Sequence, residues 1–484
     1  MAFKRDLIFI SSGRIVATVM ALITMRAVTS FLTPEQYGQL ALLIAIQVFC
    51  GLLLINPVGQ HINLHTHAWW DSGTLLPRLK SFKHYVLAVS LVGAVLVFAI
   101  NQKYSAAQFL YTAISMFAMV IAATWNATLI PMLNMLGFRA ASVLFSTMTI
   151  IVSLLSSILL VMWLKSATAW FIGQMIGLGI GALGARYILQ KYSKQLTQSK
   201  NTISLLNKYT VISYCLPLAV ATGFMWLQLS GYRFVVEHYY GLVQLGFLAV
   251  GLQLVGQIFA LVESLAIQFL YPLFFRRVSN FENNSEIELA LSDLLNTLVP
   301  VYFLLTGFVI FSAKYLLEIL VSPQYQQAVT FVMLGACIEL CRVLGNLLSN
   351  AAQVKRKTKS LAPAYAIGSV IGLFFIYFAG VRQMDIVWAC MSLTLGSIAM
   401  FVTMFINMYK QVRFTLDIKR CVASALMMLT MAAFVSLTPK FSGLMEAVVM
   451  MLLTIFIVSI AIFALLWKNP AMLRLLNVQL RANQ

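Results

Sequence analysis

The pattern of apolar and polar positions divides the chain into long apolar runs separated by short polar segments. A helix needs about 20 mostly apolar residues to cross roughly 30 Å of hydrocarbon. Backbone groups in lipid must be paired within the structure, so runs of this length predict helices, whereas a membrane barrel would show alternating segments of about 10 residues. Fourteen runs reach this length, and we expect one helix in each: 7–31, 37–56, 83–101, 107–133, 140–163, 167–189, 209–230, 243–272, 297–318, 325–350, 361–380, 384–409, 420–438 and 443–467.

Two stretches of the chain resemble each other in register with these runs. Arg26 precedes Gly38 by 12 residues, Arg233 precedes Gly246 by 13, and each glycine opens a Gly-x-Leu-Ala block near the start of a helix. Self-similarity of this kind indicates a repeated architecture. Six helices return the chain to its starting side, so the two repeats run in the same sense, as in parallel-repeat transporters.

The sequence therefore predicts an all-α polytopic membrane protein with two like halves. We expect a six-helix bundle at 1–205, a second six-helix bundle at 206–412, and two added helices with a tail at 413–484. In transporters built from such repeats the substrate binds at the interface of the repeats.

Basic residues favour one orientation of these helices in the membrane. If the N-terminus is cytoplasmic, the predicted cytoplasmic segments hold 24 of the 33 Lys and Arg residues and the outside segments hold six. Cytoplasmic loops collect Lys and Arg. We therefore expect both termini in the cytoplasm.

Composition then excludes several classes of protein. With 61% hydrophobic and 10% charged residues, the chain falls far below the roughly 25% charged residues of soluble domains. Its net charge of +19 would suggest a nucleic-acid partner, but the topology accounts for the excess and none is expected. The six cysteines form no CxxC pair, so we expect no disulfide framework and no metal site. A histidine-rich metal site at His61, His65 and His67 is the less favoured alternative.

Two stripes of small residues, one of serines and a threonine and one of glycines, favour helix packing over ligand binding. Small and hydroxyl-bearing residues let membrane helices approach closely. The first stripe lies in the span at 140–163 and the second in the span at 167–189; they consist of Ser142, Ser146, Thr149, Ser153 and Ser156, and of Gly173, Gly177 and Gly181.

Charged side chains inside the spans are candidates for function, because they are costly in lipid and usually face a bundle interior or a watery cavity. Glu339 and Arg342 lie three residues apart and can form an ion pair that only orients their helix. Alternatively, such an acid is a proton or cation switch that releases the arginine to an anionic substrate when protonated. Glu263 is the second candidate for ion coupling. Arg26 and Arg233 either line a cavity or extend to the outer surface.

The whole pattern resembles a known family of exporters. The features concerned are fourteen helices in two like halves, the segment Ser11-Ser12-Gly13-Arg14, the outside turn Leu32-Thr33-Pro34-Glu35-Gln36-Tyr37-Gly38, and basic inside turns after the fourth and tenth helices. With these features the chain resembles the polysaccharide transport (Wzx-type O-antigen flippase) proteins of the MOP exporter superfamily. The resemblance implies a V-shaped pair of bundles around a central cationic cavity. It also implies export of undecaprenyl-pyrophosphate-linked oligosaccharide repeat units, from the inner to the outer leaflet of the bacterial inner membrane, by ion-coupled alternating access.

The resemblance and the polar positions together give an expected substrate site. Arginine suits bidentate contacts with phosphate, and amides both donate to and accept from sugar hydroxyls. No cofactor is expected beyond a proton or sodium gradient. The expected partners are the lipid-linked oligosaccharide, membrane lipids and the polysaccharide polymerase machinery, and the protein is expected to be a monomer. The expected substrate-binding residues are Arg14, Arg26, Arg233, Arg342, Asn126, Asn346, Gln253 and Gln257, with Glu339 and Glu263 for ion coupling.

Other functions fit the sequence less well. A MATE-like drug or metabolite antiporter of similar architecture would favour unpaired acids for cationic drugs, whereas arginines outnumber acids here. A lipid II flippase of the same superfamily is a further alternative. A membrane-embedded glycosyltransferase or ligase would need catalytic residues in a large outside loop. The outside loops are short and carry scattered single acids, so we expect no enzymatic activity.

Overall fold

The computed structural model describes the chain except for residues 1, 100–104, 194–207, 280–283, 356, 438–442, 468 and 482–484. The side chains of 2–15 and of a few further helical residues also lie outside the description. The structure is 93% helical, and the described residues form no strand. The predicted all-α membrane fold is therefore confirmed.

The chain divides into two compact units, Met1–Gly246 and Phe247–Gln484. The first holds α1 (Ala2–Phe31), α2 (Pro34–Phe49), the π-helical turn η1 (Cys50–Ile55), α3 (Asn56–Asp71), α4 (Leu75–Leu96), α5 (Ala106–Met135), α6 (Arg139–Leu164), α7 (Ala167–Ser193), α8 (Lys208–Trp226), the π-helical turn η3 (Leu227–Gly231) and the first part of α9 (Tyr232–Phe269). The second holds the rest of α9, then α10 (Tyr271–Ser279), α11 (Asn284–Leu320), α12 (Val329–Val354), α13 (Ala362–Val381), α14 (Ile386–Gln411), α15 (Ile418–Ala433), α16 (Leu444–Leu466) and α17 (Pro470–Arg481).

The described residues of each of the fourteen predicted runs are mostly helical, and within the described part of the chain eleven helical segments are long and apolar enough to count as candidate membrane spans. The seventh and eighth runs merge into one segment across a kink at Gly241, where φ is 80°. The first run contributes only the shorter apolar helix Val19–Phe31, and the thirteenth corresponds to α15, which has 16 residues. The difference in number therefore reflects merging and length rather than missing helices.

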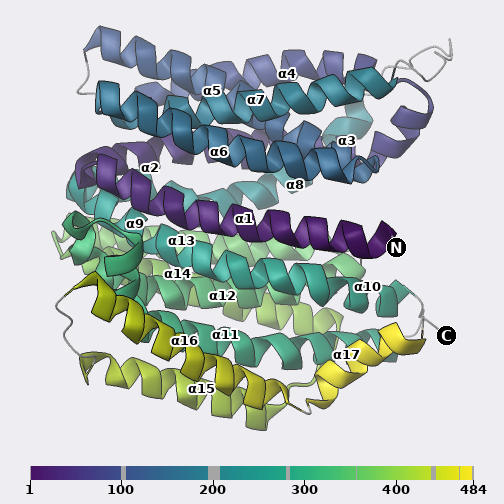
Figure 1. Cartoon of the computed structure of the whole chain (residues 1–484), viewed down its shortest axis with the longest axis vertical. Coiled ribbons are helices and arrows are strands. Elements are labelled where there is room, and N and C mark those ends of the chain that lie inside the picture. Colours follow the sequence, from purple (N-terminus) through teal and green to yellow (C-terminus); the bar gives the residue numbers. More distant parts are fainter. Residues whose placement is uncertain are drawn as a thin grey trace. The chain divides into compact units, whose positions relative to one another are not determined.

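The hydroxyl stripe of α6 and the glycine stripe of α7 form a packing seam, as predicted. A Cβ atom on Gly173 or Gly177 would lie within 2.4 Å of the backbone nitrogen of Ser157 or Ser153. The Ser156 hydroxyl donates to the carbonyl of Gly173 at 2.7 Å. Helices α5, α6 and α7 consequently run side by side in the first unit (Figure 1).

The predicted outside turn at 32–38 is the start of α2. Thr33 and Gln36 form a capping box, in which each side chain accepts a hydrogen bond from the other residue's backbone N–H. Pro34 occupies the first turn, where its missing N–H removes no helical bond. The Gln36 amide also donates to the carbonyl of Lys165 at 2.7 Å, which ties this turn to the end of α6.

The two glycines of the repeated motif meet at a crossing between α2 and α9. A Cβ on Gly38 would lie 2.1 Å from the carbonyl oxygen of Leu242, and a Cβ on Gly246 would lie 1.9 Å from the carbonyl oxygen of Pro34. The contact is reciprocal, because each glycine meets the carbonyl four residues before the other. Only glycine permits this backbone approach, which explains why both motifs carry it.

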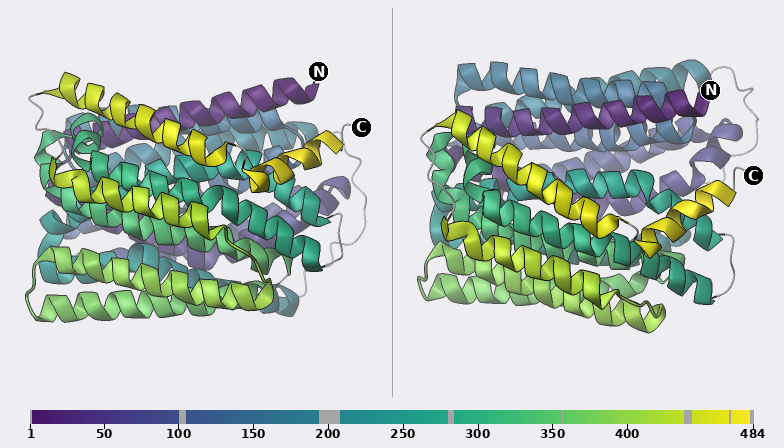
Figure 2. Two further views of the ribbon diagram at one scale, coloured as in Figure 1. Left: turned by 90° about the horizontal axis from the view of Figure 1, so that it is seen from below. Right: turned by 60° about the horizontal axis from the view of Figure 1, so that its bottom comes forward.

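Helix α11 is the centre of the second unit. It packs against α10, α12, α15, α16 and α17, and 78% of its most apolar stretch is buried, a larger share than in any other candidate span. Helix α16 crosses it obliquely, and α17 lies with α10 at one end of it (Figure 2). The hairpin of α15 and α16 is thus packed on α11.

The glycine crossing predicts a stability effect. Gly38→Ala places a methyl group against a backbone oxygen that cannot rotate away, so we expect a loss of about 1–3 kcal/mol, typical of overpacking. Gly246→Ala should cost a similar amount. Melting of the detergent-solubilised protein, followed by tryptophan fluorescence, measures both losses.

The control for this pair is Gly179→Ala in α7, because a Cβ there meets no atom within 4 Å. Equal melting temperatures for Gly38→Ala and Gly179→Ala would contradict the crossing.

Candidate functional site

A charged cluster lies inside the second unit, between α9 and α12. The guanidinium of Arg342 donates from Nε to Glu339 Oε2 at 2.6 Å and from Nη1 to Glu263 Oε2 at 3.1 Å. The Asn346 amide donates to the other oxygen of Glu263 at 2.9 Å. The structure therefore joins four of the predicted site residues in one hydrogen-bonded network, which we call the Glu–Arg cluster.

The Glu–Arg cluster is largely shielded from solvent. Side-chain exposure is 21% for Arg342 and 15% for each of the two glutamates. With both acids ionised, the cluster carries one more negative charge than positive. An unbalanced carboxylate in a poorly hydrated site favours uptake of a proton or a cation. This arrangement can therefore couple the position of Arg342 to ion binding.

Tyrosines from three other helices surround this cluster. Tyr271 of α10 hydrogen-bonds with Asn350, one turn of α12 beyond Asn346. Tyr302 of α11 and Tyr365 of α13 both lie within electrostatic range of Glu263 and Arg342. These phenol groups give the cluster a polar surrounding within an apolar bundle.

In the first unit, Arg233 has a backbone partner. Its Nη1 donates to the carbonyl of Ala41 at 2.9 Å, next to the glycine crossing, and its guanidinium lies 5.9 Å from the centre of the Tyr232 ring. The indole of Trp226 likewise donates to the carbonyl of Ala45 at 2.9 Å. Arg233 therefore helps to hold α9 against α2. Its predicted contact with substrate stays a prediction.

The other predicted site residues do not belong to the Glu–Arg cluster. Asn126 donates to Thr149 Oγ1 at 3.1 Å and to the Leu178 carbonyl at 3.0 Å, which links α5 with α6 and α7. Arg26 is half-buried in α1, while the side chain of Arg14 lies outside the described residues. The remaining two, on α9, are the exposed Gln253 and the half-buried Gln257.

A second charged cluster has no counterpart in the sequence predictions. Asp293 of α11 is 1% exposed and accepts hydrogen bonds from Arg277 Nη1 at 2.8 Å and from Arg474 Nε at 3.0 Å. The hydrogen bond with Asp293 raises the pKa of Arg474 above its ordinary value. We call these three residues the Asp293 anchor; it joins α10 and α17 to α11.

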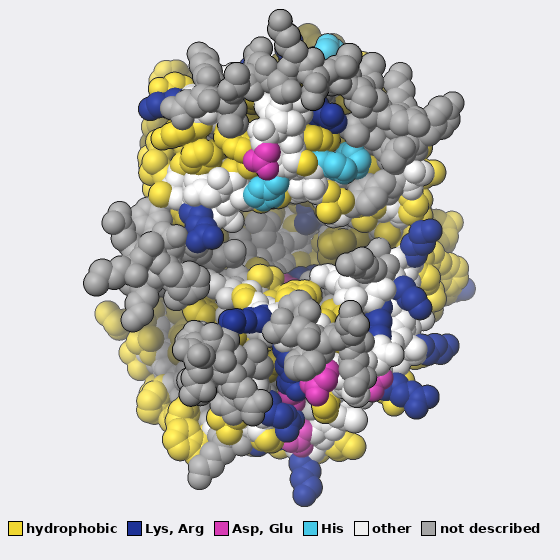
Figure 3. Space-filling model, turned by 90° about the vertical axis from the view of Figure 1, so that its right-hand side faces the viewer, with side chains coloured by type: hydrophobic (Ala, Val, Ile, Leu, Met, Phe, Trp, Pro, Cys, Tyr) yellow, Lys and Arg dark blue, Asp and Glu magenta, His cyan; other side chains and the backbone are white. Residues whose placement is uncertain are grey.

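Neighbouring polar groups extend the Asp293 anchor to the segment after α14. The backbone N–H of Asp417 donates to Asn296 Oδ1 at 2.7 Å, and that of Thr415 donates to Ser292 Oγ at 2.9 Å. The Asn469 amide donates to the Asn296 carbonyl at 3.3 Å. The face of the second unit at which α10 and α17 end carries Lys and Arg side chains with a few acids among them (Figure 3). This end of α11 thus contacts α10, α17 and the segment after α14.

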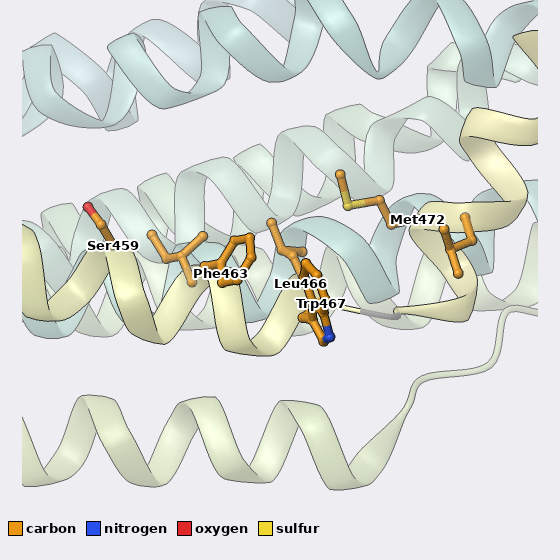
Figure 4. A pocket seen from close by; sticks show the side chains of 7 residues that line it. Ser459, Phe463, Leu466, Trp467 and Met472 are labelled. Carbon is orange, nitrogen blue, oxygen red and sulfur yellow. The ribbon is translucent and has the colours of Figure 1, made fainter.

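An apolar pocket of about 580 Å³ opens between α16 and α17. Phe463, Leu466 and Trp467 project into it from the end of α16, and Met472 from α17 (Figure 4). Among the described lining residues, Ser459 is the single one with a hydroxyl, amide or charged side chain. The pocket suits a hydrocarbon chain rather than a polar ligand.

The histidine-rich segment forms an aromatic stack in α3. The rings of His65 and Trp69 lie 5.3 Å apart at 19°, and the guanidinium of Arg78 lies 4.5 Å from the Trp69 ring centre. Among the described residues, no three His, Cys, Asp or Glu side chains are grouped as metal ligands. All six cysteines are free thiols.

Comparison with known proteins places this fold. No family model matches the chain, and no curated protein matches it in sequence. Among solved structures it is similar to "Lipid II flippase MurJ, inward closed conformation", with a TM-score of 0.67 and 12% identity over 95% of this chain and 98% of that one. The chain has the fold of the MOP-superfamily transporters.

Two MATE structures share this MOP fold. An inward-facing multidrug resistance MATE family transporter of the MOP superfamily matches 86% of this chain and 96% of its own, with a TM-score of 0.56 and 11% identity. The eukaryotic MATE transporter AtDTX14 matches 89% of this chain and 96% of its own, with a TM-score of 0.50 and 14% identity. Identities this low establish the fold alone.

The Asp293 anchor predicts a large effect of removing its acid. Asp293→Ala removes the buried carboxylate that Arg277 and Arg474 share, and breaking a buried ion pair in this way costs about 3–5 kcal/mol. We expect reduced protein levels in membranes and a lower melting temperature in detergent.

A matched control is Glu286→Ala, since Glu286 is more exposed and contacts only Arg277, at 3.4 Å, among the ion pairs of the described residues. Comparable losses in the two variants would argue against a specific role for the buried acid.

Proposed function

We propose that this protein is a flippase that moves a polyprenyl-pyrophosphate-linked oligosaccharide from the inner to the outer leaflet of the cytoplasmic membrane. The observation that carries the proposal is the match to the lipid II flippase, which covers 95% of this chain. The MATE matches span 86% and 89%. Lipid II is the transported molecule named for that neighbour, and a lipid-linked glycan is proposed here by analogy.

The chemistry of the described residues supports an anionic substrate with a lipid tail. Arginines inside apolar helices can contact pyrophosphate through two parallel hydrogen bonds. The proposed pyrophosphate ligands are Arg14, Arg26, Arg233 and Arg342. The apolar pocket between α16 and α17 offers space for part of a hydrocarbon tail.

We propose that the Glu–Arg cluster supplies the ion coupling. In the structure Arg342 is held by Glu263 and Glu339 together, so it is not available to a phosphate. Neutralising one acid by a proton, or screening it by a sodium ion, weakens the attraction that holds the guanidinium. Arg342 would then turn to an anionic substrate, and loss of the ion would return it.

The proposed setting is a multi-pass protein of the bacterial inner membrane with both termini in the cytoplasm. The basic end of the second unit supports this orientation, because anionic lipids of the cytoplasmic leaflet attract Lys and Arg. We further propose that the protein acts as a monomer and delivers its product to a polysaccharide polymerase.

Lipid II transport is the second candidate, favoured by the TM-score of 0.67 to the lipid II flippase. The two functions differ in the glycan that the lipid carries. O-antigen or another surface repeat unit is the substrate that we propose for this chain.

Loss of the protein gives the direct test. In cells lacking the chain, lipid-linked repeat units should accumulate facing the cytoplasm while surface polysaccharide disappears, because synthesis continues without export. Extraction of the lipid fraction, with identification of its glycan by mass spectrometry, measures the accumulation. Accumulation of lipid II instead would favour the second candidate, and accumulation of neither lipid would refute a flippase function.

The coupling role of the Glu–Arg cluster has its own test. Glu263→Gln keeps the shape of the side chain and one of the two oxygens that accept from Arg342 and Asn346, but removes the charge that takes up the ion. We expect normal protein levels with export lowered about tenfold or more, equivalent to about 1.4 kcal/mol in the barrier. Surface polysaccharide, normalised to protein in the membrane, is the readout.

The matched control is Glu286→Gln, which alters a glutamate outside this cluster. Unchanged export by Glu263→Gln, or a loss explained entirely by lower protein levels, would leave the cluster with a structural role only.

A further inference from the structure

A second cavity lies inside the first unit and has a different chemistry from either charged cluster. Its volume is about 400 Å³, within the range of about 300–1,000 Å³ typical of small-molecule sites. One wall comes from α2, η1 and α3, and the other from α5. The polar groups that line it are Gln47, Asn56, Asn63, Thr124 and Thr128, and no charged or histidine side chain is among its described lining residues.

The three amides of this cavity have no hydrogen-bond partner among the described residues. Within the part of the chain that the structure describes, the side chains of Gln47, Asn56 and Asn63 make no hydrogen bond. An amide in an apolar helix is costly unless its donors and acceptor are satisfied. Three of them facing one cavity therefore indicate that water or a ligand satisfies them.

The π-helical turn η1 brings these amides to one side. Residues in a straight α-helix advance by about 100° each, which would place Gln47 on the side opposite Asn56 and Asn63. The turn at Cys50–Ile55 adds one residue to the helix, and the N–H of Asn56 bonds the carbonyl of Gly51, five residues back. The extra residue rotates α2 by about 100° relative to α3, so that Gln47 faces the cavity. The carbonyl of Leu54 is bonded by the Tyr85 hydroxyl at 2.8 Å.

Two glycines on this wall also leave space in the cavity. Gly51 and Gly59 line the cavity, and a Cβ on either would meet no atom within 4 Å. The glycines of the packing seam in α7 are different, since a Cβ there would collide with α6. Gly51 and Gly59 therefore widen the cavity rather than permit helix contact.

We propose that this cavity binds an uncharged sugar residue of the transported glycan. The inference rests on the proposed flippase function and adds a sugar subsite to it. Amides and threonine hydroxyls donate to and accept from sugar hydroxyls, and the absence of charge in the described lining makes the cavity unsuited to pyrophosphate. The glycan and the pyrophosphate are thus recognised by separate groups of residues.

Binding to the purified full-length protein in lipid nanodiscs tests the subsite. Two probes are compared: a polyprenyl pyrophosphate that carries the oligosaccharide of the host, and the same lipid without sugar. We expect the wild type to bind the glycosylated lipid about tenfold more tightly, the effect of a few net hydrogen bonds. Asn56→Leu with Asn63→Leu should abolish this preference while affinity for the bare lipid stays the same.

Two further variants separate sugar binding from folding. Gly59→Leu fills the cavity but keeps all three amides, and it should remove the preference as well. Gln60→Leu removes an exposed amide of α3 that does not line the cavity, and it should change nothing. Melting temperatures of all variants verify that they are folded.

The outcomes distinguish the two proposals. If the wild type binds both lipids equally, or if folded Asn56→Leu/Asn63→Leu and Gly59→Leu variants keep the preference, the sugar subsite is refuted and the flippase function stands. If the wild type binds neither lipid, both proposals are refuted. Loss of preference in both cavity variants, with retained binding of the bare lipid, supports the subsite.

Discussion

The backbone contact between α2 and α9 brings Arg233 and Trp226 within reach of α2 in the first unit. Gly38 and Gly246 each lie against a carbonyl of the other helix, so the two helices approach without intervening side chains. At this distance Arg233 reaches the carbonyl of Ala41, and Trp226 reaches that of Ala45. The N–H groups of Arg233 and Trp226 thereby find acceptors in a low-dielectric environment, where an unpaired donor would be costly. A repeated glycine motif is thus explained by one reciprocal contact.

The sequence predicted the helices well because their signal is local. Apolar runs of about 20 residues have no other stable structure in lipid, and the stripes of α6 and α7 follow from helical spacing alone. The pairing of Glu339 with Arg342 was predicted for the same reason, since both lie on one helix. The division into six-helix halves stays a prediction.

Contacts between distant segments could not be predicted in the same way. Glu263 bonds Arg342 across 79 residues, and nothing in either helix specifies that partner. Asp293 falls outside the predicted runs, because the nearest of them begins at 297, whereas α11 begins at Asn284. The amide cavity was missed because a regular helical projection separates Gln47 from Asn63. A one-residue π insertion has no recognised sequence signal, so its rotation of the helix is visible only in the structure.

The two units carry different polar chemistry. The second unit contains two hydrogen-bonded groups of opposite charges, the Glu–Arg cluster and the Asp293 anchor. The described cavity of the first unit holds neutral amides that are not satisfied by the protein. Paired charges suit switching, because removing one charge changes the whole group, whereas uncommitted amides suit recognition of a neutral polar ligand.

The Asp293 anchor also has a consequence for biosynthesis. Arg474 follows Asp293 by 181 residues, so at about 5–20 residues per second the ribosome needs roughly 10–40 s to produce the second arginine. During that interval Arg277, which precedes Asp293, is the one arginine of the anchor already made. The Asp293 anchor therefore forms in full only after α17 has been synthesised and has docked on α11.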